Sequence, residues 1–286
     1  MIMSVGFLFL SPFTLGYITI CFIPPEQTLS KKNIFFYPWA TASSSMLIAM
    51  LLGFEGAICL IMMCPIWLLL ASLGGIVGAA VRKRKATELR SITLLLLLSP
   101  FGVSALETAF PSPTQTYYTE NKLEMRCSAE DVWQEIRSVR AIEPHELHYS
   151  LSRFMGFPDP IEAKLIGEGV GAIREATFAG GVTFTETVTE WVPNRALAFG
   201  IRANTERIPR TTLDEHVTIG GEYFDMLNGR YDIAPTGKDS VLVTLSSEHR
   251  LSTKFNFYAS LWSKAIMSSI QKNILQVVQA RCEGKK

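Results

Sequence analysis

The alternation of apolar and polar positions divides the chain into two parts that meet near Pro111. Before that point, four long apolar runs follow one another with few charged residues between them. A helix needs about 20 mostly apolar residues to cross the roughly 30 Å of hydrocarbon in a bilayer. Residues 1–110 therefore predict an all-α transmembrane bundle of about four helices, over residues 4–23, 35–54, 57–80 and 91–110.

The first apolar run has an alternative interpretation as a cleaved signal peptide. No positive charge precedes it, however, and no small-x-small cleavage site follows it, so we expect an uncleaved span. Charged residues are absent from the spans except near their predicted ends, where Glu55 and Glu107 lie. Because ionisable residues inside a membrane usually mark a transport path, the bundle is expected to be an anchor or a partner surface. Gly74 and Gly78 permit close helix contact, either within the bundle or with another protein.

Positive charges predict the orientation of the bundle. Lys31 and Lys32 follow the first span, and residues 82–85 (Arg-Lys-Arg-Lys) and Arg90 follow the third, so both loops lie on one side of a four-span bundle. Positively charged loops favour the cytoplasm. We expect a multi-pass protein of the inner or plasma membrane whose second part lies on the extracytoplasmic side. In a bacterium with an outer membrane, this side is the periplasm.

The second part reads as a water-soluble α+β domain over residues 122–286, after a Pro/Thr/Ser-rich tether over residues 111–121. A first strand is expected near residues 122–126, and a helix after the N-cap candidate Ser128. Runs rich in Thr, Val, Phe and Tyr predict further strands at residues 166–178, 182–192, 197–203, 213–219, 222–233 and 241–251. Apolar residues then recur at every third or fourth position over residues 256–281, which predicts a long C-terminal helix.

Charge and cysteine content narrow the possible partners. The formal net charge is +1, and without a basic surplus a nucleic acid is not an expected partner. No Cys/His spacing typical of a metal site occurs, and we expect no metal and no cofactor. Of the 5 cysteines, only Cys127 and Cys282 lie in the soluble part. Whether these two form a disulfide is left open, because sequence does not show how close they lie.

Four stretches of the soluble part resemble the START-like superfamily, also called SRPBCC, which includes polyketide cyclases and lipid-transfer domains. They are residues 123–133 (LEMRCSAEDVW), 220–231 (GGEYFDMLNGRY), 247–253 (SEHRLST) and 255–262 (FNFYASLW). The resemblance implies a helix-grip fold, in which a long C-terminal helix crosses a curved antiparallel sheet and leaves a space beneath it. It implies no catalytic set common to the superfamily, since this fold hosts binding proteins and enzymes alike.

Two short motifs are better explained without function. Residues 167–172 (Gly-Glu-Gly-Val-Gly-Ala) resemble a dinucleotide fingerprint, but an alternating run follows instead of the required helix, so we interpret them as a flexible start of a strand. His145 and His148 flank Glu146, but they are three positions apart rather than four and no third ligand is evident. We expect this pair to lie in a solvated loop.

The candidate site lies in the predicted strands and the last helix. Glu186 and Glu190 interrupt an apolar strand face, which suggests a pocket with polar anchors; alternatively they are solvated, or paired with an arginine such as Arg174 or Arg202. Candidate ligand-binding residues are Glu186, Trp191, Tyr223, Tyr231, Tyr258 and Trp262, although the aromatic residues could equally form the core. Candidate catalytic residues are Asp214, His216 and His249, where a histidine near a carboxylate can transfer protons; the alternative is a structural role.

The leading functional interpretation is membrane-anchored binding of a hydrophobic small molecule or lipid, without covalent chemistry. One alternative is a cyclase, dehydratase or isomerase that acts on an apolar substrate. Another is an envelope scaffold whose protein partner docks on the spans. The expected partners are the lipid bilayer and the apolar ligand, whose identity the sequence does not predict.

Overall fold

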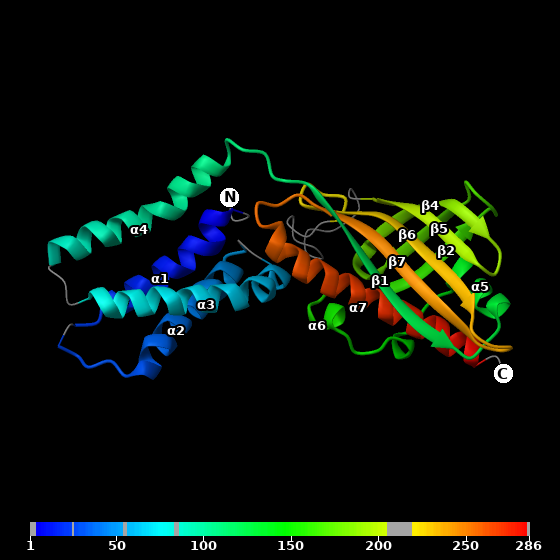
Figure 1. Cartoon of the computed structure of the whole chain (residues 1–286), viewed down its shortest axis with the longest axis horizontal. Helices are drawn as coiled ribbons and strands as arrows, with labels where there is room; N and C mark the ends of the chain where they lie inside the picture. The colour runs from blue at the N-terminus through cyan, green and yellow to red at the C-terminus, as the bar shows by residue number, and fades with distance from the viewer. Residues whose placement is uncertain (1–3, 25, 54–55, 83–85, 205–218, 285–286) are drawn as a thin grey trace. The chain divides into compact units, whose positions relative to one another are not determined.

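The computed structural model describes residues 4–24, 26–53, 56–82, 86–204 and 219–284 (Figure 1). The chain forms two compact units: Met1–Pro113 with Thr253–Phe255, and Thr114–Ser252 with Asn256–Lys286. The first contains the apolar helices and the second contains the sheet.

Helices make up the first unit. A short π-helical turn η1 (Gly6–Leu10) leads into α1 (Ser11–Cys21), and α2 (Lys31–Leu51), α3 (Ala57–Val81) and α4 (Ala86–Glu107) follow. Three stretches, Lys31–Leu51, Ala57–Val81 and Arg90–Glu107, are long and apolar enough to cross a membrane, while Gly6–Cys21 is shorter. The apolar runs are thus helical as expected, and the count of four spans stays a prediction.

Small residues bring α1 and α3 into close contact. A Cβ atom added to Gly74 would lie 1.9 Å from the carbonyl oxygen of Phe13, and one added to Gly16 would lie 1.9 Å from that of Ala71. Only glycine fits at such distances. Gly78 lies against α1 in the same way, so the Gly74–Gly78 spacing serves packing within the bundle.

Two polar contacts show how the helix ends are arranged. The carboxylate of Glu107, at the end of α4, accepts hydrogen bonds from the backbone nitrogens of Val5 and Gly6 at 2.9 and 3.0 Å. Arg82, after α3, donates to the carbonyl oxygen of Gln27, which precedes α2, at 2.6 Å. The start of the first helix and the end of α4 therefore lie at one end of the unit, and Arg82, just after α3, lies beside the segment that precedes α2.

The second unit is a seven-stranded antiparallel sheet crossed by a long helix (Figure 1). The strands are β1 (Gln115–Met125), β2 (Pro160–Ile166), β3 (Ile173–Phe178), β4 (Thr183–Val192), β5 (Ala196–Ala203), β6 (Phe224–Pro235) and β7 (Val241–Leu251), in the order β1-β7-β6-β5-β4-β3-β2. Short helices α5 (Ala129–Arg137) and α6 (Leu151–Phe154) and the turns η2 (Pro144–Glu146) and η3 (Ala179–Gly181) connect them. The last element is α7 (Asn256–Glu283). An antiparallel sheet crossed by a long C-terminal helix is the arrangement of the predicted helix-grip fold, which is confirmed.

Two expected boundaries differ from the structure. Residues 115–121, expected in the tether, belong to β1, because their Thr and Tyr residues pair with β7 from Gln115↔Leu251 onward. The strand expected at residues 166–178 is instead two strands joined by the turn 167–172, where Gly167, Gly169 and Gly171 have φ angles of 84°, 84° and 90° that favour glycine. The strand expected at residues 213–219 falls almost wholly outside the described residues.

A disulfide closes the second unit. Cys127, just after β1, bonds to Cys282, near the end of α7, with their Cα atoms 5.9 Å apart and a sequence separation of 155. The sequence leaves open whether these two cysteines pair, and the structure shows that they do.

The core of the unit fills the space beneath the last third of α7. Val132, Trp133 and Ile136 of α5 pack there with Leu275 and Val278 of α7. The helix α5 begins where expected, because the hydroxyl oxygen of Ser128 accepts a hydrogen bond from the backbone nitrogen of Asp131. Beneath the middle of α7, side chains do not fill the space.

Candidate functional site

A cavity lies between the middle of α7 and the sheet. About 150 Å³ of it is open to the centre of a water-sized sphere, roughly ten times what one water requires. Its apolar wall includes Met267, Ile270 and Ile274 of α7, Ala176, Phe184, Phe199, Ile201, Met226 and Leu245 of the sheet, and Ile142, Phe157 and Pro158 before β2. The space under the long helix is therefore open, and its character is apolar.

A buried ion pair forms the polar part of this wall. Arg174 of β3 and Glu186 of β4 are register partners, and Nη1 of Arg174 donates to Oε2 of Glu186 at 2.5 Å. Only 3% of Arg174 and 7% of Glu186 is exposed. The guanidinium also lies 5.0 Å from the ring centre of Phe199. Both charges therefore sit in the cavity wall, away from water.

Burial shifts the pKa of two polar residues in the cavity wall upward. Burial raises the pKa of Glu186, and the neighbouring Arg174 offsets only part of that rise. Burial likewise raises the pKa of Tyr231, whose phenol stays protonated at neutral pH and can donate a hydrogen bond. Within the described residues, Nε of Arg174 has no hydrogen-bond partner.

A second polar group, around Gln271 of α7, is occupied within the protein. Nε2 of Gln271 donates to the carbonyl oxygen of Thr119 at 3.1 Å and to the hydroxyl of Ser247 at 2.9 Å. Its Oε1 accepts from Nδ2 of Asn121 at 2.7 Å. These bonds attach α7 to β1 and β7 along one side of the cavity and so fix the position of α7 over the sheet.

Of the ligand-binding residues expected from the sequence, Glu186 and Tyr231 line the cavity. Trp191, Tyr223, Tyr258 and Trp262 are not among its lining residues. The pairing of Glu186 with Arg174, which the sequence offers as an alternative, is present.

A β-bulge explains why Trp191 and Glu190 differ from the expected alternation. The register of β4 with β5 shifts between Val188 and Glu190, so the residues after the bulge exchange faces. Trp191 turns inward and packs edge-on against Trp133, with ring centres 5.0 Å apart. Glu190, expected on the face of Glu186, instead pairs with Arg230, a half-exposed side chain on β6.

The sequence interpretation missed Ser247 and Gln271 and treated Arg174 only as a pairing partner. A signal for Gln271 exists, since it lies one turn after Met267 and three residues before Ile274 on the apolar stripe of α7. A signal for Arg174 is its place between Ala172 and Ala176 in an alternating strand.

The catalytic candidates do not meet in the cavity. Asp214 and His216 lie outside the described residues. His249 is fully buried, but it is not a lining residue of the cavity. Its Nε2 lies 2.9 Å from the hydroxyl of Ser263 on α7, and its ring stacks on Tyr117 at 5.8 Å between centres. Burial, and secondarily the charge of Lys264, lowers its pKa to about 4.

Loss of stability in mild acid is the expected consequence for His249. Below pH 6.5 the unfolded chain takes up a proton that the folded chain does not take up until about pH 4. This histidine therefore lowers the free energy of unfolding by about 2 kcal/mol at pH 5 relative to pH 8. Urea titrations of His249→Phe should show a shallower decline between pH 8 and pH 5 than those of the native chain. His145→Phe, at an exposed histidine, should decline as steeply as the native chain. If the free energy of unfolding falls equally with pH in both variants, His249 is not the source of the acid sensitivity.

The His145–His148 stretch is structural. Glu146 accepts hydrogen bonds from Nε and Nη2 of Arg281 at 2.6 and 2.8 Å, and this contact lowers the pKa of Glu146 to about 2. Both histidines are exposed. Within the described part of the chain, no group of three metal-ligating side chains comes together.

Comparisons with known proteins concern the second unit. No family model matches the chain, and no curated protein matches it. Among solved structures, truncated norcoclaurine synthase from Thalictrum flavum is 18% identical over 58% of this chain and 93% of its own, with a TM-score of 0.37. The Zhui aromatase/cyclase from Streptomyces sp. R1128 is 12% identical over 60% of this chain and 97% of its own, with a TM-score of 0.38. The fold assignment rests on the sheet order and on α7.

Proposed function

We propose that the soluble domain binds one apolar small molecule or lipid in the cavity beneath α7, while the N-terminal helices hold the domain at a bilayer. The observation that carries this proposal is the open apolar cavity with a charged pair in its wall. Binding of this kind needs no covalent step. Anchoring keeps the cavity close to the membrane, where apolar molecules concentrate.

The ligand has an apolar body and at least one hydrogen-bonding oxygen. Apolar walls match the body, and Glu186 and Tyr231 present an acceptor and a donor to the oxygen. A buried ion pair is weak support for stability, since apolar residues of similar volume often serve as well. Its presence in the cavity wall is therefore best explained by recognition of a polar group.

Several observations support an extracytoplasmic domain. The Cys127–Cys282 disulfide is typical of an oxidising compartment. The Arg82–Gln27 contact joins Arg82, a charge of the loop after α3, to the segment that leads to Lys31 and Lys32, and positively charged loops favour the cytoplasm. The Glu107 contact with Val5 and Gly6 places the start of the first helix at the end where α4 leads to the domain, as a four-span bundle requires.

Native mass spectrometry of the full chain tests the binding proposal. The chain is purified from cell membranes into nanodiscs of one synthetic lipid, so that a retained molecule is recognised by its different mass. We expect a bound apolar molecule, and we expect Ala176→Phe to lose it, because Ala176 lines the cavity. Ala234→Phe places the same ring at an exposed position of β6 and should retain the molecule. An empty native cavity, or equal retention by both variants, would contradict binding in this cavity.

One observation favours an enzymatic alternative. A carboxyl group whose pKa is raised, as burial raises that of Glu186, is suited to proton transfer in an apolar site. A cyclase or isomerase would then use Glu186 on the bound molecule. If so, Glu186→Gln should retain a molecule of different mass or structure from the one that the native protein holds. An identical molecule in both would exclude turnover by Glu186. An envelope scaffold role stays a prediction.

A further inference from the structure

One side of the cavity is formed by the segment between α5 and β2, which we name the cover segment (residues 138–159). Its inner side supplies Ile142, Phe157 and Pro158 to the cavity wall. Its start is paired with β2 through the backbone of Val139 and Ile142. The segment therefore has one side toward the cavity and another toward the surroundings of the domain.

The outer side of the cover segment is apolar. Tyr149 is 82% exposed and Phe154 is 61% exposed, and Leu151 is exposed as well. Leu151 and Phe154 are three residues apart in α6, so they lie on the same side of that helical turn. Exposed apolar side chains grouped in this way mark a surface that contacts another apolar phase.

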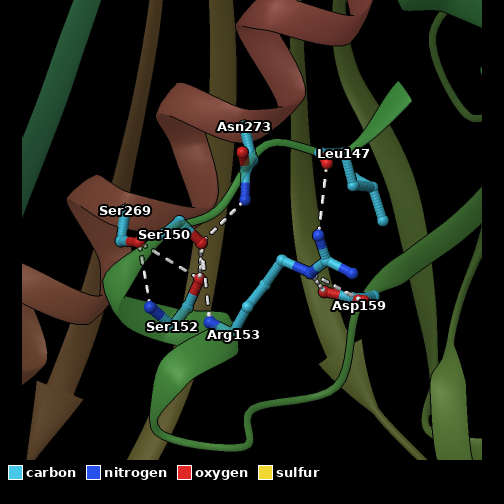
Figure 2. A network of polar contacts seen from close by, with 7 residues as sticks. All are labelled: Leu147, Ser150, Ser152, Arg153, Asp159, Ser269 and Asn273. Carbon is cyan, nitrogen blue, oxygen red and sulfur yellow. Dashed lines mark hydrogen bonds and ion pairs between the residues drawn. The ribbon is translucent and has the colours of Figure 1, made fainter. Parts of the chain in front are cut away.

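Neutral hydrogen bonds attach the middle of the cover segment to α7 (Figure 2). The backbone nitrogen of Ser152 donates to the hydroxyl of Ser269 at 3.0 Å, and Nδ2 of Asn273 donates to the hydroxyl of Ser150 at 2.9 Å. Arg153 does not reach α7 in this network but binds Asp159 of the segment itself (Figure 2). Bonds of this type contribute little net stability, because water replaces them when they open.

The first part of the segment is tied to α7 by charged hydrogen bonds. Arg281 binds the carboxylate of Glu146 and donates to the carbonyl oxygens of Arg140 and Ala141 at 3.1 and 2.8 Å. Charged, paired hydrogen bonds of this kind are stronger than neutral ones. The structure thus attaches the first part of the segment to α7 by charged bonds, and the part that carries the exposed Leu151 and Phe154 by neutral ones.

The length of the tether indicates what covers this surface. The helix α4 ends at Glu107 and β1 begins at Gln115. The residues between them reach about 25 Å when fully extended, so a domain attached to membrane-spanning helices stays within that distance of the bilayer. Tyr and Phe are suited to the membrane interface, and the exposed Lys272, next to Asn273 on α7, suits lipid phosphates.

We propose that Tyr149, Leu151 and Phe154 dock on the lipid bilayer and so place the cover of the cavity against the membrane. The cover segment is then the route by which a ligand passes between lipid and cavity. Docking itself needs only the exposed surface and the short tether, whereas the passage of a ligand rests on the proposed function.

Quenching of tryptophan fluorescence by brominated phospholipids tests the docking. The full chain is reconstituted into vesicles as Phe154→Trp and, for comparison, as Val170→Trp. Val170 is 69% exposed in the β2–β3 turn, which is not part of the cover segment. After subtraction of the native signal, we expect the Trp at position 154 to be quenched at least twofold more than the Trp at position 170. Quenching at position 154 that is absent, or equal to that at position 170, would overturn the proposal. The same result is expected if another protein covers the surface in place of lipid.

A second variant separates docking from binding. Phe154→Asp should slow the loading of an emptied chain with its apolar molecule severalfold, as followed by native mass spectrometry, and leave the final occupancy unchanged. Val170→Asp should load at the native rate. Unchanged loading for Phe154→Asp would overturn the passage of ligand by this route. A cavity that stays empty in the native chain would refute the proposed function, while the quenching result would still decide the docking.

Discussion

Replacement of Cys127 by Ser lowers the free energy of unfolding of the soluble domain by about 4 kcal/mol. The disulfide to Cys282 closes a loop of 155 residues, which is almost the whole domain. Without it the unfolded chain gains conformational freedom, and a loop of this length gains more than a short one. For a domain of this size the melting temperature should fall by roughly 10 °C.

The measurement is a urea or thermal titration of the full chain in nanodiscs, followed by tryptophan fluorescence. Cys282→Ser and the double variant should match Cys127→Ser, because each removes the same bond. Dithiothreitol should destabilise the native chain by the same amount and leave the variants unchanged. Cys64→Ser, at a free cysteine of α3, serves as the control. A native chain that is indifferent to the reductant would show that the bond does not form.

The same bond reports on topology in living cells. If the domain lies outside the cytoplasm, Cys127 and Cys282 should resist alkylation until a reductant is added. If the domain faces the cytoplasm, both thiols should be alkylated directly. This result would reverse the orientation inferred from the positively charged loops.

The elements that the sequence predicts well are those whose pattern is local. The apolar run of α3 has the length of a span, and the apolar stripe of α7 repeats at the helical period. In β7 alternate residues from Val241 to Leu245 are buried, as the period of a strand requires. Such patterns need no knowledge of the neighbouring elements.

The features that the sequence does not predict depend on partners far along the chain. Trp191 joins the inner face of the sheet because one bulge in β4 exchanges the faces beyond Val188, whereas alternation alone places it on the opposite face. Residues 115–121 were interpreted as tether because their neighbours are Pro, Thr and Ser, and only pairing with β7 identifies them as strand. The Arg174–Glu186 pair likewise requires the register of β3 and β4, which no local pattern supplies.

Removal of one partner of the buried pair should have the second large effect. Arg174→Leu leaves Glu186 alone in an apolar wall and should lower the free energy of unfolding by about 3–5 kcal/mol at neutral pH. Glu186→Leu leaves an unpaired Arg174 and should cost a similar amount. The double variant has no buried charge and should recover most of the lost stability. A double-mutant cycle in urea measures the coupling directly.

The two single variants should differ in how they respond to pH. Without Arg174, burial alone acts on Glu186 and raises its pKa further, so that the carboxyl group becomes neutral as the pH falls toward its unfolded value of 4.5. The instability of Arg174→Leu should therefore shrink between pH 7 and pH 5. Glu186→Leu should show no such recovery, because an arginine does not lose its proton in this range.

The double variant also decides why the pair exists. If the pair serves recognition, Arg174→Leu/Glu186→Leu should be stable and yet lose the apolar molecule seen by native mass spectrometry, or accept molecules without an oxygen. If it retains the same molecule with the same occupancy, the pair has no role in binding. A double variant that stays unstable would show instead that the pair organises the sheet around Phe199, whose ring lies under the guanidinium and fills the space left by Gly229.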